Sequence, residues 1–101
     1  MNALSLVASI VERDTLRYTP AGLPIVGGIL RHASQQREAG IDRQVEFEIP
    51  AVAAGEISGR FASAELGAVQ VFRGFLAKKN SNSKTLVFHI IDFSAVPDSS
   101  I

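Results

Sequence analysis

Basic side chains gather in one stretch of this chain, residues 69–93. Two runs rich in β-branched and aromatic residues flank a polar segment at 80–84, which is typical of a β-hairpin with a several-residue loop. The expected hairpin carries four cations: Arg73, Lys78, Lys79 and Lys84. No acidic residue occurs between positions 69 and 91, although the whole chain has ten basic and ten acidic residues. This local excess of positive charge predicts an anionic partner.

The chemistry that fits such a hairpin is nucleic-acid binding. On an extended strand Arg73 and Phe75 share one face. Cations interleaved with an aromatic ring can neutralise phosphates while a base stacks on the ring. Two other interpretations stay open. The lysines could only keep the hairpin tip from pairing with other sheets, and Phe75 could belong to the core.

Catalytic and metal-binding patterns are missing from the sequence. His32 and His89 fall in different expected strands, and no spaced acidic cluster accompanies them. Cysteine is absent, which excludes disulfides, thiolate catalysis and Cys-ligated metals and fits a reducing compartment. No phosphate-binding glycine motif or nucleophile elbow occurs. We therefore predict a protein that is not an enzyme and uses no metal or cofactor.

Length and composition indicate one domain that spans residues 1–101. At this length a single modest core is barely sufficient, so oligomerisation would help stability. Hydrophobic residues make up 47% and charged residues 20% of the chain, which is a globular composition. Neither a signal peptide nor a membrane-length apolar run occurs. We expect a cytoplasmic protein without membrane contact.

Hydrophobic patterning predicts five strands. They cover residues 4–12, 25–32 and 44–49 and the two sides of the hairpin. In the third of these, Val45, Phe47 and Ile49 should point inward, and Pro50 should mark its end. The first strand is apolar on both faces, so part of it should be covered by another element or chain.

The connections between these strands look irregular. The polar segment 33–42 is expected to be a mobile loop. Residues 51–66 are rich in Ala, Gly and Ser, and Gly55 and Gly59 argue against more than one helical turn. Residues 96–101 are expected to be a frayed tail. Five strands without a confident helix favour an all-β, five-stranded oligonucleotide/oligosaccharide-binding (OB) barrel with an extended hairpin between strands 4 and 5.

The chain resembles the primosomal replication protein N (PriB) family, which is similar to bacterial single-stranded DNA-binding protein. The matching residues are Leu16-Arg17-Tyr18-Thr19-Pro20-Ala21-Gly22-Leu23-Pro24, Leu30-Arg31-His32, Glu38-Ala39-Gly40, Arg43-Gln44, Ile49-Pro50, Gly67 and Arg73-Gly74-Phe75-Leu76. The resemblance implies an OB fold, a homodimer and non-catalytic binding of single-stranded DNA. It also implies a role in replication restart with the PriA helicase and other primosome proteins.

Matching cationic or polar positions of the family adds Arg17, Arg31 and Arg43 to the hairpin cations as candidate DNA contacts. The chain departs from the family where aromatic residues can stack on bases, because it has Ile41 and Glu46 there. A carboxylate repels phosphate, so the lysines would have to supply more of the affinity.

An alternative function is a protein-interaction adaptor in replication with vestigial DNA binding, which Glu46, Glu48 and the neutral net charge favour. An oligosaccharide-binding barrel ranks last, because exposed Trp or Tyr platforms are missing. For the homodimer, we expect residues 4–11 of the first strand to form the seam, since pairing them with a second copy buries an apolar face and a strand edge.

Overall fold

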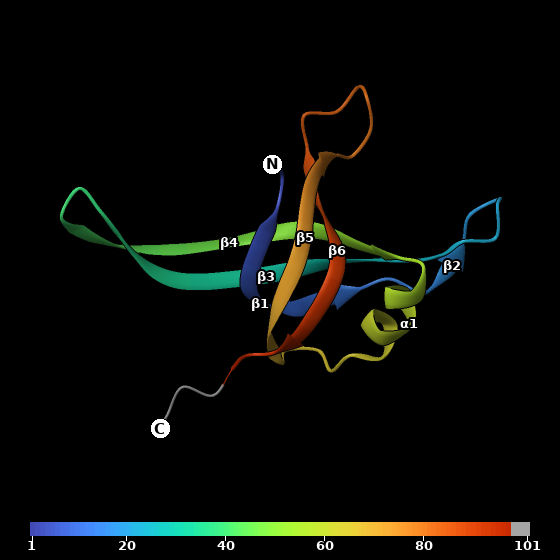
Figure 1. The fold of residues 1–101 in the computed structure, drawn as a ribbon, viewed down its shortest axis with the longest axis horizontal. Helices are drawn as coiled ribbons and strands as arrows, with labels where there is room; N and C mark the ends of the chain where they lie inside the picture. Colours follow the sequence, from blue (N-terminus) through green and yellow to red (C-terminus); the bar gives the residue numbers. More distant parts are fainter. Residues whose placement is uncertain (98–101) are drawn as a thin grey trace.

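The computed structural model describes residues 1–97 as six strands and one helix (Figure 1). The elements are β1 (Leu4–Arg13), β2 (Arg17–Tyr18), β3 (Pro24–Glu38), β4 (Ile41–Ala54), α1 (Glu56–Ser63), β5 (Val69–Lys78) and β6 (Leu86–Ala95). The sheet order is β1-β5-β6-β4-β3-β2, and a further pairing of β1 with β3 closes the sheet into a barrel. Among the strands of residues 1–97, β4 and β6 are the one parallel pair. The predicted five-stranded OB barrel is therefore confirmed, with the β5–β6 hairpin between its fourth and fifth strands.

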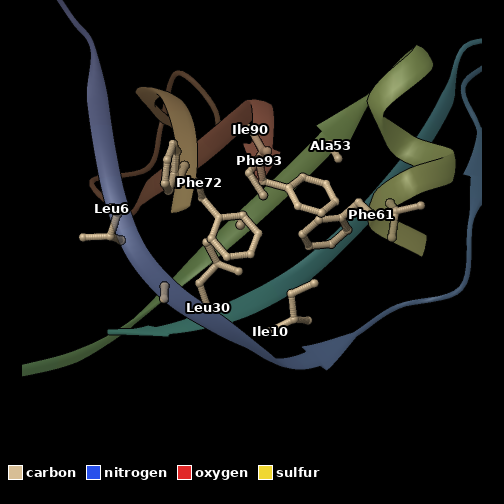
Figure 2. Close-up of a cluster of buried hydrophobic side chains, with 12 residues drawn as sticks. Leu6, Ile10, Leu30, Ala53, Phe61, Phe72, Ile90 and Phe93 are labelled. Atoms are coloured by element: carbon tan, nitrogen blue, oxygen red, sulfur yellow. The ribbon is translucent and has the colours of Figure 1, made fainter. Parts of the chain in front are cut away.

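Aromatic rings from α1, β5 and β6 fill the barrel. Phe61, Phe72 and Phe88 are fully buried. The rings of Phe72 and Phe93 stack with their centroids 5.3 Å apart, and Phe61 meets Phe93 edge-on at 6.2 Å. Figure 2 shows this cluster beside Leu6, Ile10 and Leu30 from β1 and β3. Burial of these side chains supplies most of the stabilisation of such a small barrel.

The predicted loop at 33–42 is wrong, because these residues continue a long hairpin. β3 and β4 stay paired in register from Ile25↔Ala54 to Glu38↔Ile41. The hairpin turns at Ala39 and Gly40, whose φ angles are 53° and 77°. We call the part that extends beyond the barrel, residues 33–48, the arm (left in Figure 1). Most of its residues are polar, which fits a hairpin with both faces in solvent, and cross-strand backbone hydrogen bonds hold it extended.

Pro50 does not end its strand, contrary to expectation. β4 runs on to Ala54 and pairs Pro50 with Ile29 of β3. Along its other edge β4 has no partner until it meets β6 at Ala51. Proline is tolerated there because a strand edge without a partner needs no N–H donor.

The helix α1 is longer than the single turn that the glycines suggest. It has eight residues and begins after Gly55, whose φ angle is 78°. The ring of Phe61 anchors the helix in the core, and Arg13 donates a 3.3 Å hydrogen bond to the Phe61 carbonyl oxygen near its C-terminal end. Core packing and this charged donor outweigh the poor helix propensity of Gly59.

The chain ends beyond β6 without further regular structure in the described part. Val96 and Pro97 follow the strand, and residues 98–101 of the expected tail lie outside the described residues. Within residues 1–97 no helix is long and apolar enough to cross a membrane.

Gly74 in β5 should be intolerant of any side chain. A Cβ there would overlap the backbone carbonyl of His89 and the ring of Phe88. We expect Gly74→Ala to lower the free energy of unfolding by about 1–3 kcal/mol or more in urea denaturation.

Gly59→Ala is the matched control, because a Cβ at Gly59 meets no atom within 4 Å. Inside α1 this change should raise stability by about 0.5–1 kcal/mol. Equal stability of the two variants would contradict the close approach of β5 and β6.

Candidate nucleic-acid interface

The tip of the β5–β6 hairpin presents three lysines to solvent. Lys78 ends β5, and Lys79 and Lys84 lie in the loop that projects above the barrel (Figure 1). All three are exposed. We call these three residues the lysine tip. Within residues 1–97 none of them is within ion-pairing distance of a carboxylate.

Local hydrogen bonds shape the loop that carries the lysine tip. The N–H of Lys79 donates to the carbonyl of Thr85 at 2.9 Å and closes the hairpin. Inside the loop, the N–H of Asn82 donates to Oδ1 of Asn80 at 2.9 Å, and the N–H of Thr85 donates to Oγ of Ser83 at 3.0 Å. These Asx and Ser turns explain why the polar segment makes a defined loop.

Arg73 lies at the base of the hairpin, away from the lysine tip, and its charge is compensated. Its Nη1 is 3.5 Å from Oδ2 of Asp92 and donates to Oγ of Ser94 at 3.2 Å. Asp92 also pairs with Arg60 at 3.3 Å. The sequence pattern missed this pairing because Asp92 lies one residue beyond the stretch that lacks acidic residues. A bulge in β6 places it opposite Arg73.

The remaining predicted arginines lie on two other parts of the molecule. Arg31 lies at the base of the arm and pairs with Glu48 at 2.6 Å. Arg43 lies on the arm and pairs with Glu38. Arg17 is exposed on β2, on the opposite side of the barrel from the arm (Figure 1). The seven predicted contacts are therefore spread over the lysine tip, the hairpin base, the arm and β2. Only the three lysines form a compact group.

One face of the arm is a ladder of charged and amide pairs. Arg31 lies opposite Glu48 and Arg37 opposite Asp42, with Gln35 and Gln44 between them. Glu46 lies opposite Ala33, which cannot neutralise it, and Glu46 has no ion pair among the described residues. A phosphate crossing this face would meet an uncompensated carboxylate.

The other face of the arm exposes an aromatic ring that was predicted to point inward. Phe47 is 39% exposed, and its ring lies 5.0 Å from that of His32. It is exposed because β4 runs from the arm toward the barrel and joins the barrel only after this residue. Ile41, which replaces a possible stacking residue, is 66% exposed at the arm's end. The sequence pattern missed the length of the β3–β4 hairpin. A hairpin longer than the barrel would have indicated that Phe47 and Ile41 are exposed.

Phe75 lies on the outer surface of the barrel, so the alternative that it belongs to the core is wrong. It is 36% exposed and stacks on His89, with the centroids 4.9 Å apart and the planes 6° apart. A groove of about 430 Å³ beside this pair is lined by Val52, Ala54, Glu56, Ile57, Ile90 and Ile91. The outer sheet face therefore offers apolar contact area, separate from the lysine tip.

No cluster of three metal-ligating side chains occurs in the described part of the chain. His32 and His89 lie on different strands and each packs against an aromatic ring. The geometry offers contacts for a charged or apolar partner.

Comparison with known proteins gives a consistent result. A family profile described as "Another single-strand binding protein family" matches residues 2–92. The replication restart protein PriB of Nitrosomonas europaea is 41% identical over 90% of this chain and 84% of its own length. The PriB protein of Bordetella pertussis is 40% identical over 89% of this chain and 84% of its own length.

Solved structures agree. The PriB structure from Ralstonia solanacearum superposes with a TM-score of 0.87 at 45% identity and covers 94% of this chain and 97% of that one. The single-stranded DNA binding protein from Thermus aquaticus has a TM-score of 0.72 at 20% identity, covering 98% of this chain and 52% of that one, and so shares the fold. Together with the predicted resemblance, these matches show that the chain belongs to the single-strand binding protein family and, within it, to the PriB replication restart proteins.

Proposed function

We propose that this protein binds single-stranded DNA without catalysis and acts in replication restart. The observation that carries the proposal is the lysine tip, whose three exposed cations have no carboxylate partner in the described structure. A single strand that lies across the tip releases counterions, which supplies affinity without sequence preference. The names of the PriB relatives support the replication restart role.

The arginines contribute less in this proposal. Arg31, Arg43 and Arg73 already pair with carboxylates, so a phosphate must compete for them. These pairs are exposed, and exposed ion pairs contribute only about 0–1 kcal/mol, so a phosphate can replace them. Arg17 is free to extend the path across β2.

The proposed assembly is a cytoplasmic homodimer that works with the PriA helicase and other primosome proteins, as the family resemblance implies. From Leu4 to Ala8, β1 is paired only with β5, and its pairing with β3 begins at Ser9. Val7 on this stretch of β1 is 41% exposed, and Val69 of β5, which pairs with Ser9, is 59% exposed. A second copy of β1 would cover the backbone edge and the apolar side chain of Val7 beside it.

A second candidate function is a protein-interaction adaptor with weak DNA binding. The uncompensated Glu46 and the apolar groove beside Phe75 favour it, because both suit a protein surface better than a phosphate backbone. The two functions differ in how oligonucleotide binding responds to charge changes.

Replacing Lys78, Lys79 and Lys84 with Ala tests the lysine tip directly. Binding of an oligothymidylate should weaken by about tenfold or more at low salt. The slope of log affinity against log salt should also become shallower by about 2, because each single-strand phosphate contact contributes about 0.7. Fluorescence anisotropy titrations at several salt concentrations measure both quantities.

The double variant Ser81→Ala, Asn82→Ala is the matched control, because it alters the same exposed loop without changing its charge. Its affinity and salt slope should equal those of the wild type. An unchanged slope in the lysine variant would rule out the tip as the DNA site.

Glu46→Gln should strengthen oligonucleotide binding by several-fold, because an exposed like charge about 4 Å from a phosphate costs about 1 kcal/mol in water. Glu65→Gln is the control, since it makes the same charge change at an exposed residue outside the arm. An equal gain in both variants would mean that only net charge matters. No gain in Glu46→Gln would favour the adaptor function.

Sedimentation at micromolar concentration tests the assembly. The monomer mass is 10.8 kDa, and we expect a species of about twice that mass. A single 10.8 kDa species would contradict the homodimer.

A further inference from the structure

β1 changes partners halfway along its length, and this leaves a defined stretch of open backbone. The carbonyl of Ile10 accepts from the N–H of Gly67 on the β5 side, whereas the carbonyl of Val7 accepts from His32 on the opposite side. Because backbone groups alternate along an antiparallel strand, Ser5 and Val7 point their N–H and C=O groups away from β5. We call this side of β1, before Ser9, the open edge.

The His32 side chain occupies one end of the open edge. Its Nδ1 lies 2.6 Å from the carbonyl oxygen of Val7 and must donate, since a carbonyl only accepts. In the neutral ring, Nε2 then accepts from Oγ of Ser34 at 2.7 Å, and Ser34 accepts from Nε2 of Gln36 at 3.0 Å. The ring of Phe47 covers the imidazole, which is only 8% exposed as a residue. Both ring nitrogens of His32 therefore form hydrogen bonds, which fix the orientation of the imidazole.

We propose that His32 sets the register of the homodimer by excluding Val7 from strand pairing, so that the two-fold axis crosses β1 at Ser5 or on its N-terminal side. This inference rests on the homodimer proposed above. It assigns to His32 a positioning role that the strand pattern alone does not reveal.

The exclusion follows from hydrogen bonding and from space. If the axis passed through Val7, each Val7 N–H would need the Val7 carbonyl of the second copy, and both carbonyls are held by His32. The backbone of a paired strand would lie about 4.8 Å from β1, and the imidazole occupies that space beside Val7. At Ser5 the N–H and C=O face the open edge, and no strand pairs with that edge in the described residues. Pairing centred there uses the free groups of Ser5 and places Ala3 of the second copy, which lies outside β1, opposite Val7, where the chain must turn away from the imidazole.

The natural absence of cysteine makes the register measurable. Single variants Ala3→Cys, Leu4→Cys, Ser5→Cys and Val7→Cys of the full chain are oxidised and separated on non-reducing gels. A disulfide needs two Cα atoms within about 7 Å. Each residue away from the axis moves symmetry-related positions about 7 Å further apart, because both strands contribute about 3.4 Å. Only a cysteine at the axis should cross-link efficiently.

We expect the strongest cross-link at position 3, 4 or 5 and none at position 7. Strongest cross-linking of Val7→Cys, or equal cross-linking of Ser5→Cys and Val7→Cys, would overturn the register. A dimer in sedimentation that no cysteine cross-links would also overturn it, because the seam would then lie elsewhere. A monomer in sedimentation would instead contradict the homodimer itself, so failure of the register and failure of the homodimer are distinguishable.

Two further variants test His32 in the Val7→Cys background. His32→Ala removes the imidazole from the open edge, and Ser34→Ala keeps the imidazole but removes its tether. Cross-linking at Val7 should rise several-fold with His32→Ala and less with Ser34→Ala. If neither variant changes it while circular dichroism shows a folded barrel, His32 does not set the register.

Discussion

The structure depends on the double pairing of β1. One strand hydrogen-bonds to β5 along its first half and to β3 along its second, which closes the barrel around the Phe61, Phe72 and Phe93 cluster. Because β3 meets β1 only from Ser9 onward, the rest of the β3–β4 hairpin has no place in the barrel and extends outward as the arm. The same change of partner leaves the open edge of β1. The arm and the edge therefore have one geometric cause.

Charge is distributed to match this geometry. On the arm and at the hairpin base, arginines lie beside carboxylates of neighbouring strands, and cross-strand ion pairs of this kind hold extended polar segments in register. At the loop the strands end, and no carboxylate faces the lysines within the described residues. The chain is thus neutral overall, and within residues 1–97 the lysine tip is a compact group of cations without carboxylate partners.

The sequence predicts the barrel well and the projections less well. The barrel strands contain apolar runs, such as residues 86–91, whose pattern is readable locally. Residues 33–38 are polar and become a strand only by pairing with β4, so no local hydrophobic signal marks them. The helix α1 depends on burial of Phe61, which propensity does not report. At the candidate site, the lysine tip was visible as a charge anomaly. The pairing of Arg73 with Asp92 was not, because a bulge in β6 decides it.

The paired arginines have a kinetic consequence for any approaching polyanion. An arginine that forms an ion pair with a carboxylate acts as a short dipole, and the electric field of a dipole decays faster with distance than the field of a single charge. The screening length is about 8 Å at physiological ionic strength, so the paired arginines of the arm exert little attraction on a strand that is still diffusing. The lysine tip is the part whose field reaches outward, and it orients the encounter. The paired arginines act only after contact, when a phosphate is close enough to displace a carboxylate.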